Sequence, residues 1–142
     1  MIYKATNLIK QEMEEKGLYC SINEDDDISD VVVGFGIENG PDVDVHFISS
    51  DNDNDVIVRV FGFINHVAGD KEDKILKVIN ECNDTYRYLK FVLSNGNNVD
   101  IAYDFSMKID DASVGVEAFN IFAQCVTIVR ECYPMFMKVM WE

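Results

Sequence analysis

The chain has 142 residues, a length that suits one domain with a hydrophobic core of its own. It contains 48% hydrophobic and 27% charged residues, no apolar run long enough to span a bilayer, and no N-terminal pattern typical of a secretory signal. Because 12 lysines and arginines face 26 aspartates and glutamates, the net charge is −14, which disfavours binding to nucleic acid or to an anionic membrane surface.

The cysteines lie inside apolar, periodic segments and form no C-x-x-C pair; they are Cys20, Cys82, Cys125 and Cys132. In a chain without a secretory signal, such cysteines are typical of small core residues in a reducing compartment. We therefore expect a cytoplasmic protein with neither a disulfide framework nor a zinc site.

The N-terminal half predicts one helix and then several strands. Residues 3–16 carry apolar side chains at helical spacing and are followed by Gly17, which indicates an amphipathic helix with a glycine stop. Alternating or β-branched segments then predict strands over residues 18–22, 31–37, 42–48 and 56–67. Because residues 56–67 are apolar on nearly both faces, we expect that strand to be central.

Residues 70–107 have the clearest local pattern, a helix that leads into a hairpin. Asp70 is suited to cap a helix over residues 71–86. Residues 89–93 predict a strand, and the turn at Asn95-Gly96 supplies the conformations that a tight hairpin needs. Residues 99–107 alternate without interruption, which predicts a strand with one face on the core.

A long third helix is expected from Ser113, or from an adjacent aspartate, as far as Pro134, which should end, kink or restart it. The residues beyond Pro134 remain largely apolar up to the C-terminus. This tail either folds back on its own sheet, the commoner arrangement, or forms a methionine-rich contact surface for another chain. In the second case the candidate partner-binding residues are Met135, Phe136, Met137, Met140 and Trp141.

Asp51-x-Asp53-x-Asp55 resembles the first half of a calcium-binding loop. The EF-hand pattern requires glycine at the sixth position and glutamate at the twelfth, where this chain has Val56 and Gly62. A polar hairpin loop is therefore the better interpretation.

Asp42, Asp44 and His46 share one face of a predicted strand and could bind a metal together with His66. A polar row that faces solvent explains them better, because no pattern fixes a further ligand. The sequence also contains neither a nucleophile elbow nor a glycine-rich phosphate loop. We predict no catalytic residue, no cofactor and no metal site.

Residues 79–91 resemble a motif of the YbjN family. Ile79-Asn80-Glu81-Cys82-Asn83, followed by Tyr88-Leu89-Lys90-Phe91, is similar to the paired-asparagine helix and the "KF" strand of that family. Glu131-Cys132-Tyr133-Pro134 resembles the end of the family's last helix, and the similarity in pattern extends from Ala5 to Pro134. YbjN-like proteins are described loosely as sensory-transduction regulators, and the resemblance implies the fold of type III secretion chaperones, which commonly dimerise and hold a partner segment.

Asn80, Asn83, Lys90 and Phe91 form the candidate structural motif of this resemblance. The asparagines could be functional, but a local structural role is the plainer interpretation, because asparagine amides often bond to nearby backbone.

We predict a single α+β domain over residues 1–142, with an antiparallel sheet, helices mainly on one face and the order α-β-β-β-β-α-β-β-α. The leading functional hypothesis is a non-enzymatic cytoplasmic module, a homodimer, that binds an unknown protein partner through a sheet edge or the C-terminal tail. One alternative is an acidic immunity or inhibitor protein that neutralises a basic toxin or enzyme. Another is an enzyme whose site has no recognisable pattern.

Overall fold

The computed structural model describes residues 2–50, 55–95, 97–106 and 113–142, and their elements follow the order α-β-β-β-β-α-β-β-α. The helices are α1 (Lys4–Glu15), α2 (Glu72–Thr85), which follows the 3-10 turn η1 (Gly69–Lys71), and α3 (Ser113–Met140). The strands are β1 (Cys20–Glu24), β2 (Ile28–Gly36), β3 (Asp42–Ser50), β4 (Asp55–Ile64), β5 (Lys90–Leu93) and β6 (Val99–Ser106). The predicted α+β class and element order are confirmed.

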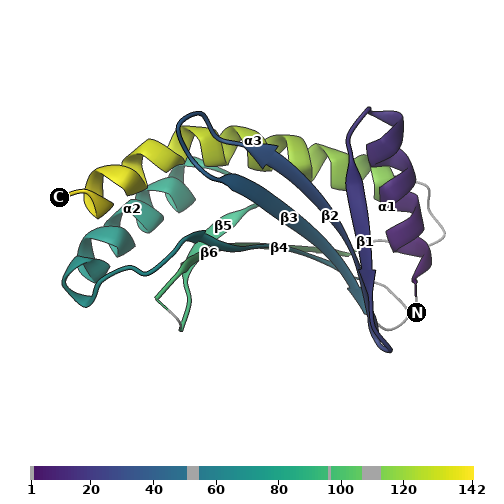
Figure 1. Ribbon diagram of the computed structural model, residues 1–142, viewed down its shortest axis with the longest axis horizontal. Coiled ribbons are helices and arrows are strands. Elements are labelled where there is room, and N and C mark those ends of the chain that lie inside the picture. Colours follow the sequence, from purple (N-terminus) through teal and green to yellow (C-terminus); the bar gives the residue numbers. More distant parts are fainter. Residues whose placement is uncertain (1, 51–54, 96, 107–112) are drawn as a thin grey trace.

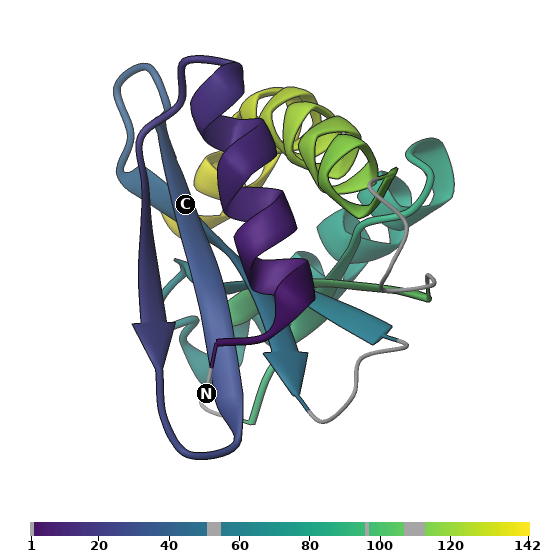
Figure 2. The ribbon, with the colours of Figure 1, turned by 90° about the vertical axis from the view of Figure 1, so that its right-hand side faces the viewer.

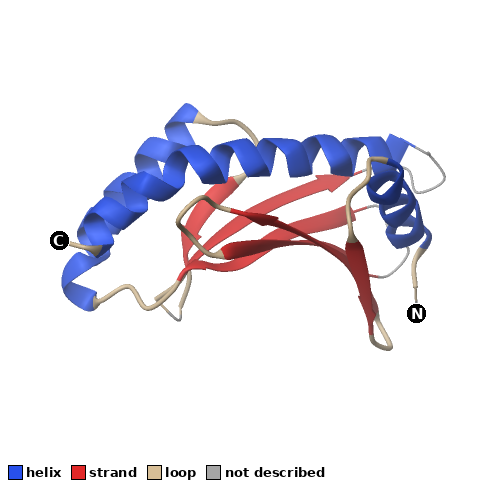
Figure 3. Ribbon diagram, turned by 45° about the horizontal axis from the view of Figure 1, so that its top comes forward, coloured by secondary structure: helices blue, strands red, loops and turns tan. Residues whose placement is uncertain are grey.

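The strands form one antiparallel sheet in the order β1-β2-β3-β4-β6-β5, so that β4 is central, as predicted, and β1 and β5 are the two edges. The helices pack on one face of this sheet, and α3 runs along its length (Figures 1 and 3). At one end α1 packs on β1, β2 and β3 beside the N-terminal part of α3 (Figure 2). At the other end α2 packs on β5 and on α3.

The core lies between the sheet and the helices, because alternate residues of the strands point toward the helical layer. Examples are Val45 and Phe47 on β3 and Val58 on β4, all of which are fully buried. Their neighbours point the other way, to the side that we call the open face of the sheet. This alternation explains why period-two patterns identified the strands, although the predicted residues 18–19 and 65–67 lie outside β1 and β4.

The glycine stop predicted for the first helix is confirmed. Gly17 has a φ of +78°, and its N–H donates to the carbonyl of Glu14 at 2.9 Å. The N–H of Leu18 donates to the carbonyl of Met13 at 3.0 Å, which completes a Schellman motif. This stop directs the chain back along α1 into β1.

The predicted cap of the second helix is wrong, and of the outcomes expected at Pro134 an end of the helix is excluded. Asp70 lies in η1 and makes no capping bond, since α2 begins at Glu72 with Lys71 before it. At the other end of the chain, α3 continues through Pro134 to Met140. Proline removes one backbone hydrogen bond, but Phe136 and Val139 lie buried beyond it, and their burial favours two further helical turns.

Several predictions fall outside the described residues. They concern Asp51 and Asp53 of the calcium-loop pattern, Gly96 of the hairpin turn, Met107 at the end of the last strand, and the connector 109–112. Within the described part of the chain, none of the helices has the length and apolar character needed to cross a membrane.

Candidate partner-binding site

A groove of about 440 Å³ lies between α3 and the loop that joins α2 to β5. The loop forms one wall with Tyr86, Arg87 and Tyr88, and α3 forms the other with Ala123, Gln124, Thr127 and Ile128. We call it the tyrosine groove. Its lining is mostly apolar with a few polar groups, which is the usual character of a binding site.

Tyr88 lies at the mouth of the tyrosine groove in an unusual conformation. Its φ is +73°, a region that bulky side chains rarely adopt, and its side chain is 46% exposed. Its ring packs edge-on against Tyr103 with the ring centroids 5.7 Å apart. Such a conformation costs on the order of 1–3 kcal/mol and persists only where neighbouring contacts hold it.

Contacts on both sides of Tyr88 hold the loop in place. The hydroxyl of Tyr86 donates a hydrogen bond to the carboxylate of Glu131 on α3. This hydrogen bond, more than burial, raises the pKa of Tyr86 to about 12, so the phenol stays a donor at neutral pH. On the other side, Lys90 Nζ donates to the carbonyl oxygens of Asn83 and Tyr86 at 2.8 Å each. The strained tyrosine is thus fixed beside α3.

The wall that α3 contributes belongs to an uncharged part of the helix. No charged residue occurs between positions 118 and 129, although 27% of the whole chain is charged. Asn120, Ala123 and Thr127 of this stretch are exposed. Solvent-facing helix positions normally carry charged or strongly polar residues. The sequence contained this signal, but the groove itself was not predicted.

Three of the four residues of the predicted structural motif form one contact cluster between α2 and β5. Asn83 Nδ2 donates to the carbonyl oxygen of Phe91 at 3.0 Å, and the N–H of Phe91 donates to Asn83 Oδ1 at 2.8 Å. Lys90 caps the C-terminal end of α2 through the bonds described above. Phe91 is buried against Phe63 and Phe136. Asn80, in contrast, is exposed. The local structural role predicted for asparagine therefore agrees with the contacts of Asn83.

Replacing Asn83 with alanine should lower the free energy of unfolding by about 2 kcal/mol, because two hydrogen bonds to Phe91 are lost. Asn80→Ala is the matched control, on the same helix but exposed, and should change stability by less than about 0.5 kcal/mol. Urea unfolding of both variants measures the difference. Equal stability of the two variants would contradict the structural role of Asn83.

The residues predicted to bind a partner after Pro134 do not share one surface. Met135 is 37% and Trp141 is 78% exposed, whereas Phe136 is fully buried. Met137 and Met140 are half-buried and pack on the core. Phe136 is thus a core residue, and its side chain is not available to a partner.

The polar row predicted on the third strand lies on the open face. His46 Nδ1 lies 2.8 Å from Asp30 Oδ2, so one ring nitrogen of His46 is engaged within the protein. Asp42 and Asp44 are exposed on the same strand, and the backbone N–H of His66 donates to Asn98. Among the residues that the structure describes, no group of three or more histidine, cysteine or acidic side chains is arranged to hold a metal ion.

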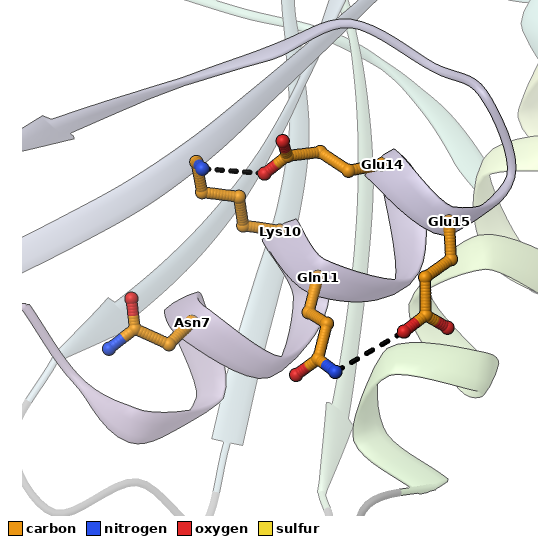
Figure 4. Close-up of a pocket in the computed structure, with 5 residues that line it drawn as sticks. All are labelled: Asn7, Lys10, Gln11, Glu14 and Glu15. Carbon is orange, nitrogen blue, oxygen red and sulfur yellow. Dashed lines mark hydrogen bonds and ion pairs between the residues drawn. The ribbon is translucent and has the colours of Figure 1, made fainter.

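A second hollow, of about 450 Å³, follows the polar side of α1 (Figure 4). Two side-chain pairs within the helix line it: Lys10 with Glu14 at 2.5 Å, and Gln11 with Glu15 at 3.2 Å. Asn7 completes the lining. Because it is open and polar, this hollow lacks the apolar floor of a small-molecule site.

Comparison with known proteins identifies no relative: no family model, no curated protein and no solved structure matches the chain.

Proposed function

We propose that the chain is a non-enzymatic, chaperone-like module, binding or regulatory in role, that holds a segment of a partner protein in the tyrosine groove. The observation that carries this proposal is a mostly apolar groove with the strained, half-exposed Tyr88 at its mouth. Strain of this kind is concentrated at functional sites. An apolar segment of a partner would cover the ring and the uncharged wall of α3.

Membership of the YbjN-like proteins, a cytoplasmic location and a homodimeric state are part of the same proposal. The order of elements and the contact cluster of Asn83, Lys90 and Phe91 support the resemblance. The free thiols, three of them buried, support a reducing compartment. The homodimeric state is what the resemblance implies, because chaperones of this fold commonly dimerise.

A second candidate function is an acidic inhibitor of a basic protein, and the open face of the sheet favours it. Its strands direct several aspartates to this side: Asp30, Asp42, Asp44, Asp55, Asp100 and Asp104. Asp30 pairs with His46, and Asp104 pairs with Arg59 at 2.6 Å. Of the others, Asp100 accepts a hydrogen bond from the N–H of Gly62 and Asp55 accepts one from Ser106. The negative charge of these carboxylates would attract a basic surface in a salt-sensitive manner.

Site-specific photo-crosslinking separates the two candidates. A photoreactive residue at Ala123 in the tyrosine groove should capture a discrete partner from native lysate, and Tyr88→Ala should remove that adduct while Tyr88→Phe keeps it. The same residue at Asp44, on the open face, is the matched control. An adduct from Asp44 alone, lost at high salt, would favour the inhibitor instead. An adduct from Ala123 with the mass of two chains would assign the groove to the homodimer.

A further inference from the structure

The two edges of the sheet differ in one respect: the β5 edge is closed by a side chain. In an antiparallel ladder, residues alternate between those that bond to the neighbouring strand and those whose backbone groups point outward. Phe91 is of the second kind, and its N–H and C=O both bond to the amide of Asn83. This amide occupies the place of a neighbouring peptide group. It prevents a further strand from pairing there.

The β1 edge is open, because among the described residues no such side chain bonds to the outward-pointing backbone groups of Cys20 and Ile22. The N–H of Asp25 bonds to the carbonyl of Ile28 at 2.9 Å, and the register pairs Asn23 with Asp30 and Ser21 with Val32. By alternation, Ser21 and Asn23 bond to β2, whereas the backbone groups of Cys20 and Ile22 point outward. Among the described strands, only β2 pairs with β1. Residues 20–24 also contain neither lysine nor proline, which commonly protect edges.

The hollow of Figure 4 is lined by α1 alone, but two of its residues are on the β1 side of the helix. Lys10 and Glu14 are on the side of α1 that faces β1 (Figure 4). They are close enough to act on Cys20: burial first, and then the charge of Glu14, raises the pKa of its thiol, while Lys10 lowers it. A strand added to β1 would therefore bring some of its side chains toward Lys10 and Glu14 of α1.

The charges around the edge select the occupant. Glu14 lies on the side of α1 that faces β1, and residues 24–27 at the end of β1 are all acidic. A second copy of the chain would bring the same carboxylates against these, on a protein of net charge −14. A basic segment would instead meet complementary charge at residues 24–27, whereas Glu14 on α1 is already paired with Lys10.

We propose that the outer edge of β1 binds an extended basic segment of a partner as an additional strand, in which lysine or arginine alternates with apolar residues. Backbone bonds to Cys20 and Ile22 give affinity, and the carboxylates of residues 24–27 select for positive charge. The proposed role of this edge rests on the proposed function, because both require a partner with an extended segment. The edge itself lies at the opposite side of the sheet from the tyrosine groove.

A pair of variants at Ile22 isolates the backbone contribution. Ile22→Pro and Ile22→Ala both lose the apolar side chain, but only proline also loses the outward N–H, and neither change removes a bond to β2. The probe is a synthetic peptide of alternating lysine and valine, compared with a glutamate–valine peptide and a lysine–glycine peptide of the same length. Binding is measured by fluorescence anisotropy.

We expect the dissociation constants of the lysine–valine peptide for the wild-type chain and for Ile22→Ala to agree within a few-fold. Ile22→Pro should bind this peptide at least tenfold more weakly. The glutamate–valine peptide should not bind. The lysine–valine peptide should slow amide hydrogen exchange in residues 18–25 of the wild-type chain. The proposal would be overturned if the lysine–valine peptide bound Ile22→Pro as tightly as the wild-type chain, or if the lysine–glycine peptide bound the wild-type chain as tightly as the lysine–valine peptide. It would also be overturned if the wild-type chain formed dimers that Ile22→Pro abolishes. If Ile22→Pro does not fold, amide hydrogen exchange of the wild-type chain decides. Exchange in residues 18–25 that the lysine–valine peptide leaves unchanged would overturn the proposal.

Tyr88→Ala distinguishes a failure of this proposal from a failure of the proposed function. It should leave binding of the lysine–valine peptide unchanged, because the tyrosine groove lies beside β5. If no peptide binds but the crosslink from Ala123 forms, the chain holds a partner without using the β1 edge. If the peptide binds but no crosslink forms, the edge is the binding site and the groove is not.

Discussion

Replacing Phe136 with alanine should lower the free energy of unfolding by about 3–5 kcal/mol, measured by urea unfolding. Phe136 is fully buried, and its ring lies 5.5 Å from that of Phe63 and 5.1 Å from that of Phe91, centroid to centroid. Truncation would leave a cavity where α3 meets β4 and β5. The loss is large because the C-terminal turns of α3, beyond Pro134, depend on this contact.

Met135→Ala is the matched control for Phe136→Ala. Met135 precedes Phe136 in the same helix and is 37% exposed, so its truncation should cost less than about 1 kcal/mol. If Phe136→Ala unfolds at nearly the same urea concentration as Met135→Ala, the tail does not pack on the core as described.

Gly115→Ala should destabilise the chain by about 1–3 kcal/mol, although alanine is the better helix former by about 1 kcal/mol. Gly115 is buried where α3 crosses α1. A Cβ atom there would lie 2.8 Å from the carbonyl oxygen of Leu8 and 2.8 Å from the Cβ of Glu12. Because the first of these is backbone, the two helices would have to move apart. Thermal or urea unfolding measures the loss.

Val116→Ala serves as the control for this crossing, since Val116 is the next residue of α3 and is 49% exposed. It should change stability by less than about 0.5 kcal/mol. A Gly115→Ala variant as stable as the wild-type chain would show that α1 and α3 are not in such close contact.

Local patterns in the sequence were sufficient to predict most of the fold. Alternation along β3 and β6 and the helical spacing of α1 depend on neighbours in the chain, so the period alone identified them. The path of α3 through Pro134 could not be predicted in this way, because it depends on packing of Phe136 against residues of β4 and β5. Tertiary contacts there outweigh the local preference of proline.

Less of the candidate sites than of the fold could be predicted from the sequence. The tyrosine groove depends on a hydrogen bond between Tyr86 and Glu131, which are far apart in the chain, and on the φ of Tyr88. The sequence predicted a sheet edge as one possible binding surface, but not which edge is open. That distinction follows from the strand order and from the bonds of Asn83 to Phe91, neither of which has a local signature.

The crosslink from Ala123 tests the central claim, that the chain holds a partner segment, most directly. We expect an adduct with a second protein that forms in the wild-type chain and in Tyr88→Phe and is absent in Tyr88→Ala. Mass spectrometry of this adduct should place the link within an apolar, extended segment of the partner. The absence of any adduct from Ala123, or an adduct that Tyr88→Ala leaves unchanged, would contradict it.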